Sequence, residues 1–238
     1  MKGAAMKITL VFLASVVVLV RPCSAGVTEP GVLALGDWSE PVANKDHFKI
    51  RGRLAICEYP AHRGFAGSDI ALYVELQEYC DNIGVVGKVY WNAESVHCEL
   101  TDSAGKTVPI SPDAYGGVIP GPSWIKLPAF SSMRLRVGPP AGGKLDEEGF
   151  MIRGKIGERW DLKPDDTKTY YLSGEFTAKP SPDYKPEDFR GVWTGTLRLP
   201  KMKISLPALR DARKDRPWES RSSRGEARME ANRRDRSI

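Results

Sequence analysis

Alternation of apolar and other residues constrains the fold of this chain more than any other feature. Between residues 70 and 77, the apolar Ile70, Leu72, Val74 and Leu76 occupy every second position. Successive side chains of a β-strand point to opposite faces, so the pattern predicts a strand with one buried and one less buried face. A single sheet would leave the apolar face in water, and a second layer must therefore cover it.

The segment 26–206 contains no amphipathic helix that could be this second layer. It consists of short alternating runs separated by Gly, Pro, Asn and Asp, which is typical of sandwiches and barrels. We therefore expect an all-β domain, a two-sheet antiparallel sandwich of about nine strands. Its expected core contains Leu72, Val74, Leu135, Leu172 and Leu197. Gly174 and Gly195 lie inside two late strands and predict a bulge or a close backbone approach.

The N-terminus carries a secretory signal pattern. Two lysines precede an apolar run of about 13 residues, and the small residues Cys23 and Ala25 follow it. A membrane-spanning helix needs about 20 residues, and Pro22 prevents the run from extending. We therefore expect a signal peptide over 1–25 and an exported protein, with periplasmic, cell-surface and extracellular locations all open.

The C-terminal segment 207–238 differs in composition from the rest. It is rich in arginine and poor in large apolar residues. Such a segment buries too little surface to offset the entropy lost on ordering. We expect a disordered, arginine-rich tail after a β-sandwich domain that spans 26–206. The tail is either a weak contact for polyanions or a solvated segment of mixed charge.

Part of the domain resembles a known family. Residues 69–108 contain an alternating strand, a Cys-Asp-Asn corner, a Val-Tyr-Trp strand and the run Cys-Glu-Leu-Thr-Asp-Ser-Ala-Gly-Lys-Thr-Val. Residues 170–177 look like the penultimate strand of the same fold. This pattern resembles the immunoglobulin-like sandwich of bacterial intracellular proteinase inhibitor-type domains. The resemblance implies an immunoglobulin-like fold and, as one alternative function, a secreted proteinase inhibitor. The signal sequence departs from an intracellular inhibitor.

No pattern in the sequence points to catalysis, a cofactor or a metal. The three histidines, at 47, 62 and 97, form no zinc-binding motif, and Ser68 lacks the Gly-x-Ser-x-Gly surroundings of a hydrolase nucleophile. Acidic clusters in 146–148 and 161–166 adjoin turn residues, where solvated acids are ordinary. We therefore expect an exported, non-catalytic module for binding or structural interaction, with protein, peptide and carbohydrate open as partners. The alternative is an exported hydrolase of an unrecognised type.

Two of the six tryptophans are candidates for a binding surface. Trp124 follows a Gly-Pro-Ser turn, and Trp160 precedes Asp161. Flat aromatic rings provide contact area at low entropic cost, so either residue could line a peptide- or carbohydrate-binding face. The other interpretation places both rings in the core of the sandwich.

Cleavage of the signal peptide would leave Cys57, Cys80 and Cys98. In a hairpin of the first two long strands, Cys57 lies opposite about residue 71, and Cys80 is about 30 Å away. A disulfide needs Cα atoms within about 7 Å. In an oxidising compartment we therefore expect Cys98 to pair with Cys57 or with Cys80. Three reduced, buried cysteines are the alternative.

Overall fold

The computed structural model describes residues 31–44, 48–59, 69–79, 87–112, 123–127, 131–138, 144–146, 149–155, 157–179 and 192–214. These ranges contain fifteen strands and two short helices. The chain is therefore all-β, as the alternating pattern predicts. No helix within the described ranges is long and apolar enough to cross a bilayer. The signal peptide expected over 1–25 lies outside them.

The described strands form four hydrogen-bonded sheets rather than the two expected. In the largest, β1 (Gly31–Leu35), β3 (Lys49–Tyr59), β4 (Asp69–Glu78) and β9 (Ser132–Arg136) pair in this order, and β2 (Val42–Ala43) also pairs with β3. The second consists of β15 (Gly195–Ile204), β13 (Tyr170–Ala178) and β6 (Val96–Asp102). The third consists of β10 (Lys144–Asp146), β11 (Gly149–Arg153), β12 (Glu158–Leu162) and β7 (Ser111–Pro112). The fourth consists of β14 (Val192–Trp193), β5 (Gly87–Trp91) and β8 (Ser123–Leu127). The two helices are η1 (Ala93–Ser95) and α1 (Leu206–Lys214).

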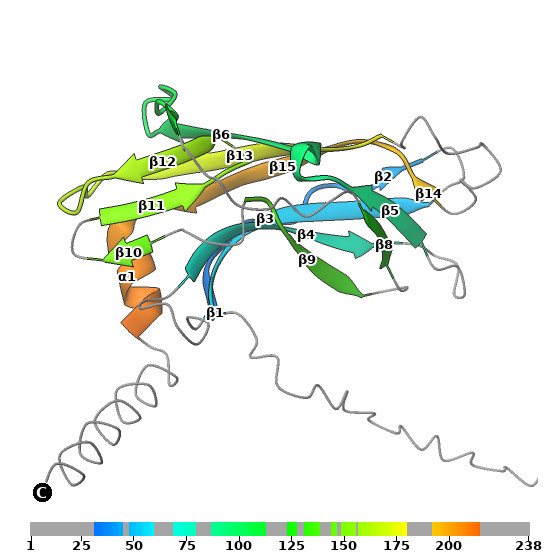
Figure 1. Cartoon of the computed structure of the whole chain (residues 1–238), viewed down its shortest axis with the longest axis horizontal. Coiled ribbons are helices and arrows are strands. Elements are labelled where there is room, and N and C mark those ends of the chain that lie inside the picture. Colours follow the sequence, from blue (N-terminus) through cyan, green and yellow to red (C-terminus); the bar gives the residue numbers. More distant parts are fainter. Residues whose placement is uncertain are drawn as a thin grey trace, which may run out of the picture.

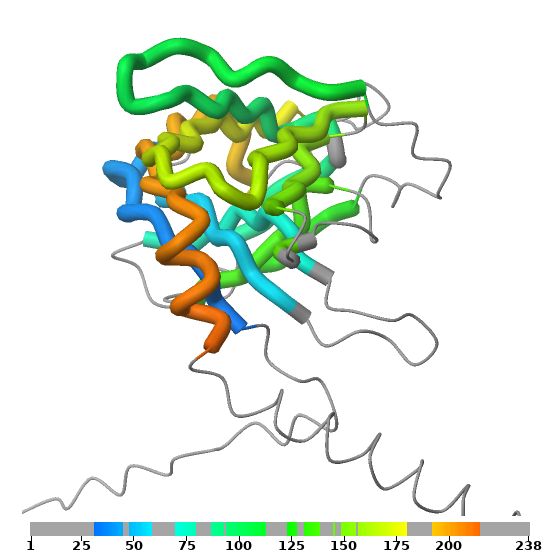
Figure 2. Tube along the Cα trace, turned by 90° about the vertical axis from the view of Figure 1, so that its left-hand side faces the viewer, coloured from blue at the N-terminus to red at the C-terminus, as the bar shows by residue number. Residues whose placement is uncertain are grey.

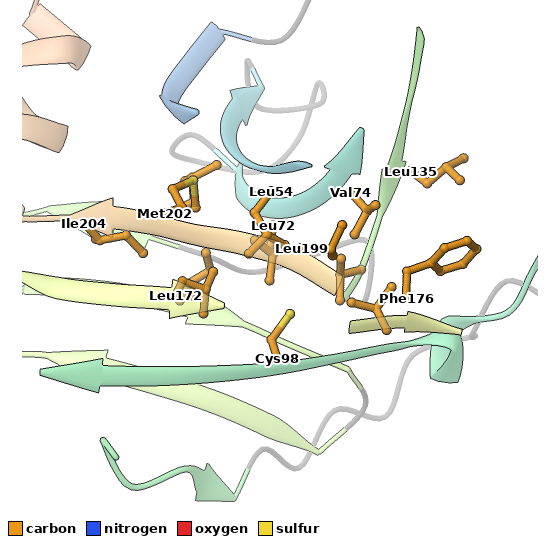
Figure 3. Packing of buried hydrophobic residues seen from close by; sticks show 14 of the residues in the cluster. Leu54, Leu72, Val74, Cys98, Leu135, Leu172, Phe176, Leu199, Met202 and Ile204 are labelled. Carbon is orange, nitrogen blue, oxygen red and sulfur yellow. The ribbon is translucent and has the colours of Figure 1, made fainter. Parts of the chain in front are cut away.

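The core lies between the β1-β3-β4-β9 sheet and the β15-β13-β6 sheet, which face each other in Figure 1. Gly52 of β3 marks the closest approach, because a Cβ there would lie 2.8 Å from Leu197 Cδ2 and 2.9 Å from Leu199 Cδ2. All five leucine and valine residues expected in the core are buried in this one cluster, and Figure 3 shows four of the positions: Leu72, Val74, Leu135 and Leu172. The predicted core is confirmed.

The hairpin of β3 and β4 has the register that the spacing of the sequence predicts. Cys57 pairs with Ala71, and Leu54 pairs with Val74. The second face of β4, however, is more buried than expected: Tyr73 and Glu75 are both about as inaccessible as the core face. β4 is a central strand with neighbours on both edges, so side chains of β3 and β9 flank its outer face as well as its inner one.

Gly174 has the role that its position predicts, whereas Gly195 begins a strand instead of lying inside one. At Gly174 the register between β13 and β15 shifts by one residue, and a Cβ there would lie 3.2 Å from Cys98 Sγ. Gly195 has a φ of +146°, which an L residue rarely adopts. The strand is interrupted at Thr194, between β14 and β15. One strand expected around 193–199 is therefore two, and β14 pairs in parallel with β5.

A stack of aromatic rings joins the fourth sheet to the core. The ring of Phe176 lies 5.6 Å from that of Trp91 and 5.9 Å from that of Trp193, centroid to centroid. The indole of Trp193 also donates a hydrogen bond of 3.0 Å to the carbonyl of Val42. Trp193 is therefore a core residue that links β14, β13 and β2.

Helix α1 extends the folded chain beyond the boundary expected at residue 206. Leu206 and Leu209 are buried in the core cluster, with Leu209 only 1% exposed. Arg213 Nε lies 3.0 Å from Oε1 of the buried Glu58, and the same guanidinium donates to the carbonyl of Leu145. Figure 2 shows α1 (orange) beside β1 (blue). The first residues of the expected tail are thus a docked helix, and those after 214 lie outside the described ranges.

The domain boundary expected at residue 206 was wrong because of a few residues next to it. The average composition of 207–238 does not show that a short amphipathic helix begins at this boundary, with Leu206 and Leu209 three residues apart on one face. Ser205 caps its start, because its hydroxyl accepts a hydrogen bond of 3.4 Å from the backbone N–H of Ala208. Pro207 lies in the first turn, where its missing N–H costs nothing.

Candidate functional site

The outer face of the largest sheet carries a band of arginines. Alternation along β3 and β9 directs the apolar neighbours inward and sends the arginines outward, onto the face opposite the core. The register sets three adjacent rows across β3, β4 and β9: Arg51–Gln77–Ser132, Arg53–Glu75–Arg134 and Ala55–Tyr73–Arg136. We call these nine side chains the arginine face. Within its rows, four arginines accompany one carboxylate.

The single carboxylate lies between two of the arginines. Glu75 Oε2 is 3.0 Å from Nη2 of Arg53 and 3.2 Å from Nε of Arg134. The hydroxyl of Ser132 donates a hydrogen bond of 2.8 Å to Oε1. Glu75 is 4% exposed, so these bonds form in a site that excludes most water. Hydrogen bonds to a desolvated charge are among the stronger ones in proteins.

Burial alone would raise the pKa of Glu75. The hydrogen bond from Ser132 and the positive charges of Arg134 and Arg53 outweigh it, and the pKa lies below its ordinary value of 4.5. A carboxyl whose pKa is lowered by folding stabilises the fold above its unfolded pKa, and that contribution is lost as the pH falls through the folded pKa.

Replacement of Glu75 by Gln is therefore expected to destabilise the protein in a pH-dependent way. At pH 7 the cost should be about 2 kcal/mol, since two charge-assisted bonds become neutral ones. Thermal melts of the two proteins should converge as the pH falls from 4.5, the ordinary pKa, through the lower pKa of the native carboxyl, because the group is then protonated in both the unfolded and the folded chain. A difference in stability that stays constant from pH 7 to pH 3 would contradict this account of the network.

Arg51 has different surroundings from those of Arg53. Its Nε donates a hydrogen bond of 2.8 Å to the neutral Gln77 Oε1. Its guanidinium carbon lies 4.8 Å from the ring centroid of Trp38 and 5.0 Å from that of Tyr79. Arg53 approaches the same Trp38 ring at 4.2 Å. The two rings hold the Arg51 guanidinium by cation–π contacts, and no carboxylate occupies its row.

Backbone pairing explains why Trp38 reaches this face. The next residue, Ser39, donates its N–H to the carbonyl of Gly52 at 2.8 Å and accepts the Gly52 N–H on its hydroxyl at 3.0 Å. The segment between β1 and β2 is thereby tied to β3 at the residue between the two arginines. Tyr79 is fixed from the other strand, because its N–H donates to the carbonyl of Lys49 at 2.9 Å.

The two tryptophans predicted as binding residues have different outcomes. Trp160 is 1% exposed and packs in the core opposite Ile152, so its assignment to a surface is wrong. On β12, Trp160 and Leu162 are buried and Asp161 between them is exposed, so the Trp160 side chain faces the core. Trp124 is half-buried on β8, with its ring 5.0 Å from that of Tyr90. The ring of Trp124 is partly accessible, and it remains a candidate contact residue apart from the arginine face.

The histidines and acidic clusters do not converge on a catalytic arrangement in the described ranges. His97 is exposed on β6, whereas His47, His62 and Ser68 lie outside those ranges. Asp161 pairs with Arg159 at 2.9 Å. No group of three or more His, Cys, Asp or Glu side chains gathers there as a metal site requires.

Asp166 has a local structural contact: it accepts hydrogen bonds from the N–H of Lys168 and the hydroxyl of Tyr170. Burial, together with Asp166 and Asp102, raises the pKa of Tyr170 to about 12. The phenol therefore stays protonated at neutral pH and can keep donating to Asp166.

The two described cysteines lie in separate clusters. Cys98 belongs to the main core, whereas Cys57 packs with Ala55, Ala71 and Tyr73 on the outer side of β3 and β4. No disulfide joins Cys57 and Cys98, so that alternative is not formed in the structure. Cys80 lies outside the described ranges. Burial, and to a lesser degree the charge of Glu158, raises the pKa of the Cys98 thiol to about 12, which makes it unreactive at neutral pH.

Comparison with known proteins gives no match to a family model, a curated protein or a solved structure. The fold and the face define an all-β protein with a cationic sheet surface. This surface was not among the sites predicted from the sequence, although the spacing of the arginines contains a signal for it. Arg51 and Arg53 flank a glycine, and Arg134 and Arg136 flank a leucine, so each pair has the period of a strand.

Proposed function

We propose that this chain is an exported, non-catalytic binding module that holds an anionic partner on its arginine face. The observation that carries the proposal is the setting of Arg51, in contact with the rings of Trp38 and Tyr79 and hydrogen-bonded to the neutral Gln77. Because the rings already restrain the guanidinium, less side-chain entropy is lost when an anion binds it. The restrained guanidinium of Arg51 is therefore expected to bind an anion more tightly than a free one would.

The chemistry of the arginine side chain defines the class of ligand. A guanidinium presents parallel N–H donors that match a carboxylate, a sulfate or a phosphate. One row away, Glu75 satisfies Arg53 and Arg134 in this manner. The row of Arg51 has no such acid, and the face as a whole carries more positive than negative charge. An acidic ligand complements this excess.

Export and the finer fold belong to the same proposal. The signal pattern over 1–25 supports an exported protein. The packing of β3 against β15 across the core supports a two-layer, immunoglobulin-like arrangement. On the sheet face turned away from the core, Arg53, Arg134 and Tyr79 are partly exposed, and related architectures use their surfaces for many unrelated functions.

The test is binding of polyanions to the purified protein and to Arg51→Gln. Labelled polygalacturonate, dextran sulfate and polyglutamate would each be titrated by fluorescence anisotropy at about 50 mM and about 500 mM salt. At least one should bind at low salt, and Arg51→Gln should weaken that binding about fivefold, the equivalent of one exposed charge contact. High salt should weaken it further.

Arg198→Gln is the matched control, because it removes the same charge from an exposed position on β15, opposite Glu175. The arginine-rich tail is present in every variant, so its contribution cancels. The proposal fails if none of the three polymers binds, or if Arg198→Gln and Arg51→Gln weaken binding equally.

A further inference from the structure

A second cationic patch lies on the sheet of β14, β5 and β8, at the end of the domain away from α1 (Figure 1). Antiparallel pairing places Lys88 of β5 directly opposite Lys126 of β8, and Tyr90 directly opposite Trp124. Residues that lie directly opposite each other share one face of a sheet. We call these four side chains the lysine–aromatic patch.

The lysine–aromatic patch faces away from the core. Val89 is buried in the core cluster, and Ile125, which lies opposite it, packs against the same cluster. Gly87 is on that inner face too, where the ring of Phe48 occupies the place of a Cβ. Side-chain alternation therefore directs the two lysines and the two aromatic residues to the outer face. Lys126 is exposed there, and the other three side chains are half-buried.

The pair of lysines is electrostatically unfavourable without an anion. Like charges directly opposite each other in a sheet destabilise it. Within the described ranges, no acidic side chain pairs with Lys88 or Lys126. A carboxylate or a sulfate between the two ammonium groups attracts both of them and offsets their repulsion. The pair therefore favours a compact anionic group as its ligand.

The aromatic pair beside the lysines offers a surface of a different kind. The rings of Tyr90 and Trp124 lie 5.0 Å apart, centroid to centroid, and their planes are inclined by 60°. Both rings are half-buried, and neither belongs to the core cluster of the described residues. An aromatic face carries partial negative charge, so it attracts the C–H groups of a saturated ring that lies on it. A saturated ring that bears an anion fits both pairs at once.

We infer that the lysine–aromatic patch binds an acidic saccharide, with the ring of a uronic acid over Trp124 and its carboxylate between Lys88 and Lys126. The two contacts are adjacent in the ligand as they are in the sheet, because the carboxyl carbon of a uronic acid is bonded directly to its ring. Nucleic acid is the less suitable ligand, since it is bound by strongly basic domains, whereas residues 26–206 contain slightly more acidic than basic side chains. The inference goes beyond the arginine face, because it concerns another sheet and other cations.

The experiment measures binding of fluorescently labelled trigalacturonate by anisotropy at about 50 mM salt. Every protein is the full chain with Arg51→Gln, so that the arginine face contributes as little as possible. The comparison ligands are trigalactose, which has the same rings without the carboxylates, and a thymidine trinucleotide, which has charges without sugar acids. Trigalacturonate should bind at least about fivefold more tightly than either one, the equivalent of one exposed charge contact.

Lys126→Glu is the sharpest variant, because it should change binding without a loss of stability. The new carboxylate lies opposite Lys88, so an ion pair replaces the repulsion, and the melting temperature should stay constant or rise. Affinity for trigalacturonate should fall at least about tenfold, since an attraction is lost and a repulsion is gained. Trp124→Leu should weaken binding about fivefold, because the face of the ring is removed.

Lys203→Glu is the matched control. Lys203 is exposed on β15 and lies opposite Tyr171, so it is a lysine beside an aromatic ring on a different sheet. It has no lysine opposite it in that pairing. The substitution changes the net charge as Lys126→Glu does, and it should leave the affinity for trigalacturonate unchanged.

The outcomes separate this inference from the proposed function. The inference is overturned if trigalacturonate does not bind, if trigalactose or the trinucleotide binds equally well, or if Trp124→Leu has no effect. It is also overturned if Lys126→Glu weakens binding no more than Lys203→Glu does. Any of these results leaves the arginine face intact, provided that Arg51→Gln by itself weakens binding of a polyanion. If Arg51→Gln has no such effect and Lys126→Glu does, the proposed function fails and the saccharide site stands.

Discussion

A chain that ends after Ser205 is expected to melt about 15 to 35 °C below a chain that ends after Lys214. The shorter chain loses Leu206 and Leu209, which are both buried, at a cost of about 2 kcal/mol each. It also loses the ion pair between Arg213 and the buried Glu58, and breaking a buried pair costs about 3 to 5 kcal/mol. For a domain of this size, each kcal/mol lowers the melting temperature by about 2 to 4 °C.

Calorimetry of the two truncations and the full chain measures the effect. The chain ending after Lys214 is the control, because it keeps every described contact of α1 and differs from the full chain only beyond that residue. Equal melting temperatures for the two truncations would mean that α1 adds nothing to the fold.

A double-mutant cycle identifies the part that the ion pair contributes. Arg213→Met alone should cost about 3 kcal/mol, since it removes the guanidinium that is paired with a buried carboxylate. Adding Glu58→Gln should recover part of this loss, because the remaining group is neutral. If the two substitutions are simply additive, the pair at 3.0 Å does not stabilise the docked helix.

Gly149→Ala is expected to have the second large effect, about 4 kcal/mol or a failure to fold. Gly149 begins β11 with a φ of +133°, a conformation that L residues rarely adopt. A Cβ there would lie 2.3 Å from the carbonyl oxygen of Leu162, which is backbone of the paired strand β12 and cannot rotate away. The strands must separate to admit a methyl group, so strain and steric conflict add.

Gly105→Ala separates these two contributions. Gly105 also has a positive φ, +80°, but nothing lies within 4 Å of a Cβ at that position. Its replacement should cost only about 1 to 2 kcal/mol, the conformational term alone. Urea denaturation of both variants gives the comparison. Equal losses at the two positions would show that the close approach to Leu162 is absent in solution.

Some of the architecture was readable directly from the order of residues. The alternation from Ile70 to Leu76 predicted β4 and its core face. The turn at 102–105 is equally local, because Asp102 accepts the backbone N–H groups of Ala104 and Lys106 around the positive φ of Gly105. These features depend on neighbours a few residues apart, which is the range over which sequence patterns act.

Only part of the candidate site follows from the sequence pattern. The period of Arg51 and Arg53 places both on one face of a strand, and the same holds for Arg134 and Arg136. Parity does not say which strands lie side by side, however. The meeting of Glu75 with Arg134 joins residues 59 apart, and the meeting of Asn44 with the Val192 carbonyl joins residues 148 apart.

The sequence by itself therefore determined that the fold is all-β and which residues of β4 face the core, because both follow from local geometry and side-chain alternation. Only the tertiary structure decided that Trp160 is a core residue, that α1 docks through Leu209 and Arg213, and that two pairs of arginines form one surface. The physical reason is that each of these depends on which distant strand becomes a neighbour. The packing of the whole core determines which strands become neighbours, and no single segment of the sequence contains that information.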